Sequence, residues 1–350
     1  MSESQQVPAL AILRKDFTSL LTFLYTLTTK ITLTLRPSEQ AFAASLAPMH
    51  DLTKYISSLT TCVTLFDSYG KTLSEDVRRG SQDVLESLKA FALAFTSIIQ
   101  QGEASDADYL VRTGAVHDSI DSVRKKLPED NLAAVRSRWA QDRAMLEDSL
   151  GEVGDMTEQG EEEEADEDFG DEFDGEWDEL GLGSAKRLNP QELARTKQVH
   201  PLLRMVVLLH KRVQLDILKA TSPTVSDASL DKLPHHSHTI LLAAEELVAA
   251  LYAPQDISSL RSTIVSSAAV VDQLRVALYQ DVLLSSEPRK PREGTDVDAL
   301  QSGLEELSVS GGSRRKKETD VRKWFDTCFE QIAKLSRTIV ASLDAECESG

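Results

Sequence analysis

Two short stretches of the chain carry residue types that could do acid–base or metal chemistry. The first, residues 113–131, reads TGAVHDSIDSVRKKLPEDN and places His117 four residues before Asp121. On a helix this spacing brings an imidazole and a carboxylate onto one face. A hydrolase also needs a nucleophile on a sharp turn and donors for an oxyanion, and neither is evident here. The stretch therefore predicts a structural helix that ends at Pro128, within which the small Thr113 and Gly114 permit close approach of a neighbouring helix.

The second stretch is a group of histidines at His235, His236 and His238. Imidazoles at short spacing suit zinc or copper, but no cysteine or carboxylate pattern accompanies them. They precede a predicted helix, where a polar loop is expected. The sequence GLG at 181–183 is interpreted as a turn because it lacks the longer glycine pattern of a phosphate-binding loop. We therefore expect no catalytic residue, no bound metal and no cofactor, and the protein is predicted not to be an enzyme.

The length allows roughly two domains, and the low glycine content, 16 residues, disfavours a loop-rich or β-rich fold. The 350 residues are 41% hydrophobic but only 5% aromatic, so the core must be built mostly of Leu, Ile, Val and Ala. The three cysteines, Cys62, Cys328 and Cys347, are too widely spaced to indicate a disulfide framework or a zinc ribbon. No long uncharged apolar run and no signal-like N-terminus is visible, so we expect no membrane span and a location in the cytoplasm and nucleus.

The negative charge of the chain is concentrated in one segment. Fourteen acidic residues and no basic residue lie between Glu158 and Glu179, and without them the net charge of −19 becomes −5. Carboxylates at this density repel one another, so we expect the segment to be disordered when the protein is free. A sequence pI near 4.8 also argues against a broad nucleic-acid surface, and no direct DNA binding is expected.

Apolar residues recur at steps of three and four along most of the remaining chain, which is typical of amphipathic helices. The first stripe consists of Leu10, Leu13, Phe17, Leu20, Leu24, Leu27 and Ile31. Eight further stripes are centred on residues 52–66, 77–98, 109–127, 132–150, 189–217, 240–251, 257–278 and 319–339. Before the sixth helix, Asn189 is predicted as the N-cap, with Pro190 in the first helical position and Glu192 in the third. No stretch predicts a strand.

The short loops between these helices predict antiparallel packing in two bundles. We expect an N-terminal five-helix bundle over residues 1–150 and a disordered acidic segment over 151–186. A C-terminal four-helix bundle is expected over 187–284 and 319–345, interrupted by a flexible linker over 285–318. That linker contains Arg314–Lys317, which reads RRKK and is either a nuclear localisation signal or a solvated linker that balances nearby acidic residues.

The acidic segment also carries apolar residues at helical spacing. They step by four, four and three and are candidates for docking to a partner: Phe169, Phe173, Trp177 and Leu180. An acidic run with such a stripe is typical of a segment that folds onto a basic, grooved partner. The alternative is a linker whose Trp177 and Leu180 dock on their own bundle.

The helix 113–131 and several later segments resemble a known family. The signature TG-x-V … LP-x-x-N is carried by Thr113, Gly114, Val116, Leu127, Pro128 and Asn131. Together with the acidic stretch that ends in WDEL, the helix HPLLRMVVLLHKRV and the segment EELVAALYAPQD, it resembles the cyclin-D-binding protein family (Grap-and-cyclin-D-interacting protein, GCIP) over most of residues 10–280. The chain departs from the family at His117, where tryptophan is common, and in the insert at 285–318.

The resemblance implies an all-helical fold of two bundles, related in shape to vinculin and catenin bundles. It also implies a non-enzymatic regulator of cell-cycle progression that binds D-type cyclins or helix-loop-helix factors and has no basic DNA-contacting region. We expect a monomer that acts through protein contacts. Two alternatives stay open: a vinculin-like cytoskeletal adaptor, and an acidic protein that binds histones or transcription factors.

Overall fold

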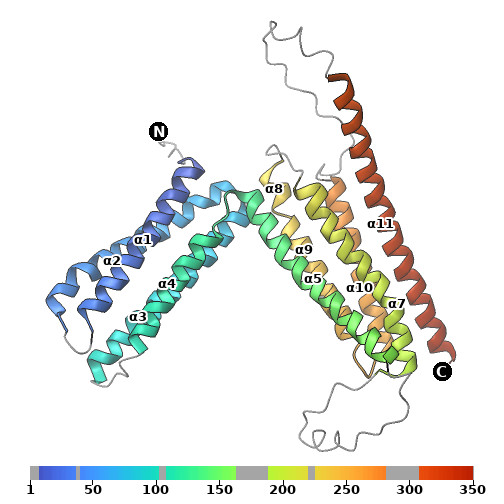
Figure 1. The fold of residues 1–350 in the computed structure, drawn as a ribbon, viewed down its shortest axis with the longest axis horizontal. Helices are drawn as coiled ribbons and strands as arrows, with labels where there is room; N and C mark the ends of the chain where they lie inside the picture. Colours follow the sequence, from blue (N-terminus) through green and yellow to red (C-terminus); the bar gives the residue numbers. More distant parts are fainter. Residues whose placement is uncertain are drawn as a thin grey trace, which may run out of the picture. The chain divides into compact units, whose positions relative to one another are not determined.

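The computed structural model describes residues 8–36, 40–101, 108–162, 188–219, 225–280 and 307–349. Within these ranges the secondary structure is entirely helical, with nine long α-helices and no strand, so the predicted all-α class is confirmed (Figure 1). The predicted docking residues Phe169, Phe173, Trp177 and Leu180, and Arg314–Lys317 as side chains, lie outside what is described. No helix in the described ranges is both long enough and apolar enough to cross a lipid bilayer.

The first half of the chain forms α1 (Leu10–Thr34), α2 (Phe42–Leu65), the short η1 (Phe66–Tyr69), α3 (Lys71–Gln101), α4 (Asp108–Lys126) and α5 (Asn131–Glu162). The second half forms α7 (Pro190–Arg212), η2 (Val213–Leu218), α8 (Asp227–Leu230), α9 (Leu233–Ala249), α10 (Ile257–Gln280) and α11 (Leu307–Ser349). The segment η2 continues α7 as a π-helical turn.

The chain divides into two compact units, each with its own core. Unit 1 comprises Met1–Ser137 and a short segment from the second half, Ser226–Asp231. In unit 1 the helices α1 and α4 run antiparallel, since Thr32 bonds to Thr113 while Thr22 accepts from Arg124. The largest fully buried side chains of its core are Phe17, Phe66 and Phe91, among leucine, isoleucine and valine.

Unit 2 comprises Arg138–Val225 and Lys232–Gly350 and therefore holds most of α5 with α7, α9, α10 and α11. Its core contains the fully buried Trp139 of α5 and Phe325 of α11. The predicted start of α7 is confirmed: the Asn189 side chain accepts from the backbone of Glu192, and the Glu192 side chain accepts from the Asn189 backbone. This reciprocal capping box satisfies N–H groups that have no partner within the helix.

Three sequence-based boundaries differ from the structure. The first bundle was predicted to reach residue 150, but unit 2 begins at Arg138, in the first turns of α5. The helix α5 also runs to Glu162, so the predicted disordered segment begins at least twelve residues too early. The flexible linker was predicted to run to residue 318, but α11 begins at Leu307. Helix continuity explains the first two differences, because a helix without a breaker shows no boundary where it leaves one core and enters another.

Candidate functional site

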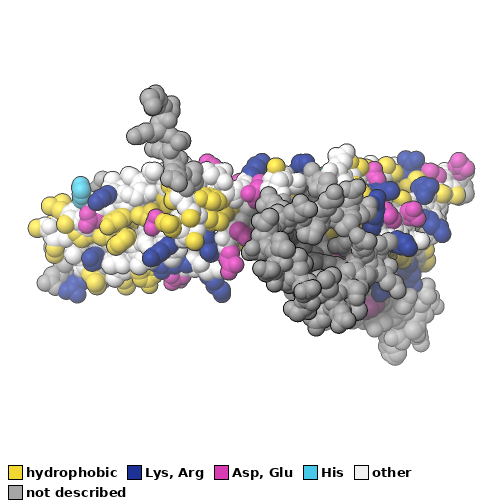
Figure 2. Space-filling view, turned by 90° about the horizontal axis from the view of Figure 1, so that it is seen from above, with side chains coloured by type: hydrophobic (Ala, Val, Ile, Leu, Met, Phe, Trp, Pro, Cys, Tyr) yellow, Lys and Arg dark blue, Asp and Glu magenta, His cyan; other side chains and the backbone are white. Residues whose placement is uncertain are grey.

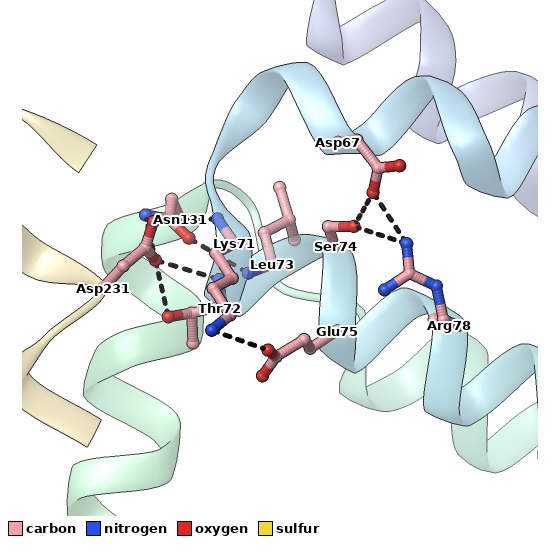
Figure 3. A network of polar contacts seen from close by, with 9 residues as sticks. All are labelled: Asp67, Lys71, Thr72, Leu73, Ser74, Glu75, Arg78, Asn131 and Asp231. Atoms are coloured by element: carbon pink, nitrogen blue, oxygen red, sulfur yellow. Dashed lines mark hydrogen bonds and ion pairs between the residues drawn. The ribbon is translucent and has the colours of Figure 1, made fainter. Parts of the chain in front are cut away.

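Asn131, the last residue of the family-like signature, belongs to a hydrogen-bonded network at the start of α3 (Figure 3). Asn131, only 3% exposed, accepts a hydrogen bond from the backbone N–H of Leu73 at 3.0 Å. Its amide nitrogen donates to Asp227 at 3.1 Å and to Asp231 at 3.0 Å. Asn131 thus joins α3, the start of α5 and the α8 segment, although these elements are far apart in the sequence.

Asp231 completes the network by accepting the first N–H groups of α3. Its carboxylate accepts from Lys71 N at 2.8 Å, from Thr72 N at 2.9 Å and from the Thr72 hydroxyl at 2.7 Å. A negative charge at a helix N-terminus is also favoured by the helix dipole. Partial burial alone would raise the pKa of Asp231, but the hydrogen bonds from Thr72, Lys71 and Asn131 outweigh it and hold the pKa below its usual value.

The backbone before α3 is shaped to admit Asn131. Gly70 has φ of +101°, a conformation that residues with a Cβ rarely adopt. A Cβ at this position would overlap the side-chain amide of Asn131. Asp67, in η1 just before Gly70, pairs with Arg78 of α3 at 2.8 Å and accepts a hydrogen bond from Ser74 of α3 (Figure 3). The signature asparagine therefore fastens segment 226–231 to unit 1, which is a structural role.

The other signature residues also pack within unit 1. Val116 is fully buried, Leu127 packs against the core, and Pro128 follows the end of α4 at Lys126. Thr113 bonds to Thr32 of α1 at 2.9 Å, which fits the predicted close approach. Gly114 does not: among the described residues no atom lies within 4 Å of where its Cβ would be, so α1 and α4 do not require a glycine there.

His117 is positioned by α1, and its contacts in the described part of the chain are with Tyr25 and Thr29. Its ring stacks on Tyr25 with centroids 3.8 Å apart, and its Nε2 lies 3.2 Å from the Thr29 hydroxyl. The nearby Asp121 instead pairs with Arg124 at 3.1 Å. These contacts agree with the structural interpretation of His117.

The histidine group 235–238 was predicted to lie in a polar loop, and this is wrong because all three residues belong to the first turns of α9. Pro234 stands at the start of this helix, where its missing N–H costs nothing. Among the described residues no three His, Cys, Asp or Glu side chains are grouped closely enough to hold a metal ion. His238 instead lies 3.8 Å from Asp142 of α5.

The residue between these histidines belongs to a buried polar cluster that sequence reasoning missed. Ser237, fully buried, donates to Asp142 at 2.5 Å and lies 2.9 Å from Nε2 of His210 in α7. Because the serine proton goes to Asp142, Nε2 of His210 must carry its own proton and donate. Burial, and then the positive charge of Arg143, lower the pKa of His210 to about 3, so its ring is neutral at pH 7.

This Ser–His–Asp grouping cannot act as a nucleophilic triad. A triad needs the imidazole to accept the serine proton, whereas here the imidazole donates to the serine. Both Ser237 and His210 are fully buried, and Trp139 stacks on His210 with centroids 4.2 Å apart. The Trp139 indole also donates to the His210 carbonyl at 2.9 Å. The cluster therefore ties α5, α7 and α9 together. The only sign of this cluster in the sequence is that Trp139 and His210 lie on the apolar stripes of their helices.

A second segment of the resemblance, EELVAALYAPQD, also supports a helix junction. Gln255 donates its backbone N–H to Glu192 at 2.9 Å, and its side chain donates to the Leu251 carbonyl at 2.8 Å. The capping carboxylate of α7 is thereby shared with the connection between α9 and α10. Asp256 then accepts from Ser258 and Ser259 and caps α10.

Most of the exposed large hydrophobic side chains of unit 1 lie towards one end of its bundle, whereas Ile12, Phe23 and Leu65 lie elsewhere on it. Large hydrophobic side chains are exposed near the end of α1, the start of α2, the end of α3 and the start of α4, elements that lie together at one end (Figure 1). They are Leu33, Phe42, Leu46, Met49, Leu93, Leu110 and Val111. Figure 2 shows hydrophobic side chains gathered on the face of this unit that it presents. Exposed apolar surface of this extent marks contact sites in many proteins.

The most regular part of this surface is the first half of α2. Phe42, Leu46 and Met49 are spaced as i, i+4 and i+7, and Leu46 is 68% exposed. Only four side chains of the 24-residue α2 are buried, and three of these lie near its C-terminal end. The first half of the helix thus presents an apolar stripe without using it in the described core, a geometry suited to a partner helix.

Comparison with protein-family models assigns the chain. Residues 16–159 match the N-terminal model described as Grap2 and cyclin-D-interacting, and residues 173–276 match the corresponding C-terminal model. The chain belongs to the Grap2 and cyclin-D-interacting protein family. No curated protein sequence matches it. The two family models together cover the helices of both units up to α10, including the network around Asn131 and the buried cluster around His210.

Proposed function

We propose that the protein is a non-enzymatic interaction scaffold that regulates cell-cycle progression by binding D-type cyclins, helix-loop-helix factors or both. Membership of a family described by its cyclin-D interaction supports the partner class. The observation that carries the proposal is the exposed apolar stripe of α2 at Phe42, Leu46 and Met49. A monomeric state and a distribution between cytoplasm and nucleus are part of the same proposal.

Binding of the purified chain to a D-type cyclin and to a helix-loop-helix domain, measured by calorimetry, tests this function. Changing Phe42→Asp and Leu46→Asp together should weaken binding at least ~10-fold, since buried apolar anchors dominate interface energetics. The matched control is Val265→Asp with Val276→Asp, which are exposed apolar residues of α10. No binding by the wild type, or equal loss in both double variants, contradicts the proposal.

A second candidate function, binding of a basic protein, is favoured by a groove on unit 2. This groove, of about 500 Å³, is lined by four carboxylates of α5, those of Glu147, Asp148, Glu152 and Asp155, together with Gly151, Met156 and Tyr252. Among the described residues, no Lys or Arg lines it. A histone or basic transcription factor would approach such a surface by long-range attraction, which salt screens.

The two functions differ in how they respond to salt. Binding of a basic partner in the groove should weaken steeply between low and physiological salt, whereas docking on the apolar α2 stripe should change little. Deleting residues 163–168 of the acidic segment should slow association with a basic partner and flatten its salt dependence, leaving the helices folded. If the association rates do not change after this deletion, the segment only connects α5 to α7 and has no role in binding.

A further inference from the structure

The outward face of α7 and η2 carries a regular stripe of exposed residues. They step alternately by three and four, so they lie in one line along the helix: Ala194, Lys197, Pro201, Arg204, Leu208, Lys211 and Leu215. We call this line the α7 stripe. Its charged members are all basic, and an apolar residue follows each of them along the line. Leu208 is 40% and Leu215 is 42% exposed.

The carboxylates of α7 and η2 do not neutralise Arg204 and Lys211 of this stripe. Glu192 is 6% exposed and is engaged by Asn189 and Gln255 in the capping box. Asp216 pairs with Arg212 at 2.7 Å, and both residues lie beside the stripe and are not part of it. The stripe is therefore a surface of positive charges alternating with apolar groups, which fits a ligand of negative charges alternating with apolar groups.

We propose that the α7 stripe is a docking surface for the chain's own acidic segment, residues 163–187. This segment contains Phe169, Phe173, Trp177 and Leu180 among carboxylates and has no basic residue before Lys186. Its carboxylates complement Arg204 and Lys211, and its aromatic residues complement Pro201 and Leu208. The sequence alone leaves open whether these residues dock on the protein itself or on a partner, and the stripe favours the protein itself.

The tether makes this contact reachable. The segment ends one residue before Leu188 and two before the Asn189 cap of α7, and its other end follows α5, whose C-terminal end lies beside the start of α7 (Figure 1). A chain of 25 residues that must go out and return spans about 40 Å in each direction at ~3.3 Å per residue. The 23 residues of α7 extend about 35 Å at 1.5 Å per residue. Contact with Pro201, Arg204, Leu208 and Lys211 is therefore within reach.

Because the segment is attached to the protein at both ends, weak contacts suffice for it to occupy the α7 stripe for part of the time. A short linker holds its ends at an effective concentration of roughly millimolar, so even a contact with millimolar affinity is occupied about half of the time. Attraction between exposed charges is screened beyond about 8 Å at physiological salt. Occupancy should accordingly fall as salt rises, while the apolar contacts limit how far it falls.

Limited chymotrypsin digestion of the full chain tests the proposal, because Phe169, Phe173 and Trp177 are cleavage points. In the wild type we expect cleavage within 169–180 to be at least ~3-fold slower than in a synthetic peptide of residues 163–187. The variant with Arg204→Glu, Leu208→Asp and Lys211→Glu should lose this protection, and the wild type should lose part of it at 1 M salt, because salt screens the charges but not the apolar contacts. The matched control, Lys323→Glu with Lys334→Glu on α11, should keep it. Circular dichroism checks that each variant is folded.

A charge-reversal rescue separates direct contact from misfolding. Adding Glu176→Lys, Asp178→Lys and Glu179→Lys to the α7 variant should restore at least half of the protection. The proposal is overturned if the wild-type segment is cleaved as fast as the peptide, or if the α11 control loses protection equally. It is also overturned if protection rises with protein concentration, because the occupant would then be a second copy.

Discussion

At the residue scale, the polar side chains that looked most like chemistry serve to join helices. His117 stacks on Tyr25, and Ser237 and His210 are buried between three helices. Asn131 and Asp231 cap the N-terminus of α3, although both lie far from it in the sequence. They accept hydrogen bonds from the backbone N–H groups of Lys71, Thr72 and Leu73. Asn131, Asp231 and Ser237 have their hydrogen bonds supplied by protein, which is the usual state of buried polar groups, whereas Nδ1 of His210 is buried without a hydrogen-bond partner.

Replacing Asp231 should loosen the start of α3. In Asp231→Asn one carboxylate oxygen becomes an NH₂ that cannot accept from the helix, so we expect a loss of about 1–3 kcal/mol in the local opening free energy. The amides of Lys71 and Thr72 should then exchange with deuterium ~5- to 150-fold faster at pH 7. Asp118→Asn, on the exposed face of α4, is the control. Unchanged exchange in Asp231→Asn would show that the carboxylate does not hold the helix start.

The same carboxylate predicts a pH dependence. Because the folded-state pKa of Asp231 is lowered, its stabilisation is present above the unfolded-state pKa of about 4 and is lost as pH falls through the folded-state pKa. The difference in stability between the wild type and Asp231→Asn should therefore shrink on acidification below about pH 4. A constant difference from pH 7 to pH 2.5 would contradict this assignment.

His210 predicts acid sensitivity in a different range. Its pKa is about 3 in the folded protein, below the ordinary value near 6.5, so the unfolded chain binds a proton that the folded chain does not. Stability should fall as pH drops from about 6.5 towards 3, by about 2 kcal/mol at pH 5. Thermal unfolding from pH 7.5 to pH 5 measures it. His210→Gln removes the titrating group and should have a flatter profile than the wild type, even if it is less stable at pH 7.

His117→Trp should be tolerated or slightly stabilising. The indole can extend the stack on Tyr25 and adds apolar area, worth up to ~1–2 kcal/mol if the space admits it. Differential scanning calorimetry gives the melting temperature. A drop of more than roughly 5 °C would mean that α1 and α4 leave no room for the larger ring.

At the element scale, a single side chain can cap one helix and also bind the connection that follows another helix. Glu192 accepts from Asn189 as part of the α7 capping box and also from Gln255 in the connection that follows α9. In contrast, the first half of α2 contributes little to the described core and leaves Phe42, Leu46 and Met49 exposed. The capped ends hold the helices in place. The exposed stripe of α2 is the surface that we propose binds a partner.

The double role of Glu192 can be measured. Asn189→Ala should destabilise unit 2 by about 1 kcal/mol, as expected for loss of an N-cap side chain. Glu192→Ala should cost more, about 2 kcal/mol, because it leaves the Gln255 amide without its acceptor as well. Urea unfolding of both variants gives the comparison. Equal costs would mean that the contact between Glu192 and Gln255 adds nothing to stability.

At the scale of the whole molecule, charge and connectivity are unevenly distributed. Two units share the long helix α5, and unit 1 takes segment 226–231 from a part of the chain that otherwise builds unit 2. Most of the net charge of −19 comes from residues 158–179, of which Glu158–Glu162 lie in the last turn of α5. The remaining charge of the chain is close to balanced.

This charge distribution predicts no measurable binding of the purified protein to duplex DNA at physiological salt. Neutralising phosphates requires clustered Lys and Arg, whereas the basic residues of the α7 stripe form a single line of three. Fluorescence anisotropy with a labelled duplex, with and without residues 163–187, checks this. Tight binding by either form would overturn the interpretation of the protein as a scaffold that contacts proteins only.

The sequence by itself determined the features that depend on neighbours in the chain. Steps of three and four between apolar residues predicted the helices, and N-P-Q-E predicted the Asn189 cap at the start of α7, because both patterns act within one or two turns. The tertiary structure decided what depends on distant partners. Asp231 caps a helix 160 residues earlier, and Ser237 meets Asp142 across 95 residues, so no local pattern could indicate either contact. The division of α5 between two cores was likewise invisible, because one uninterrupted stripe of apolar residues can face a different set of helices at each end.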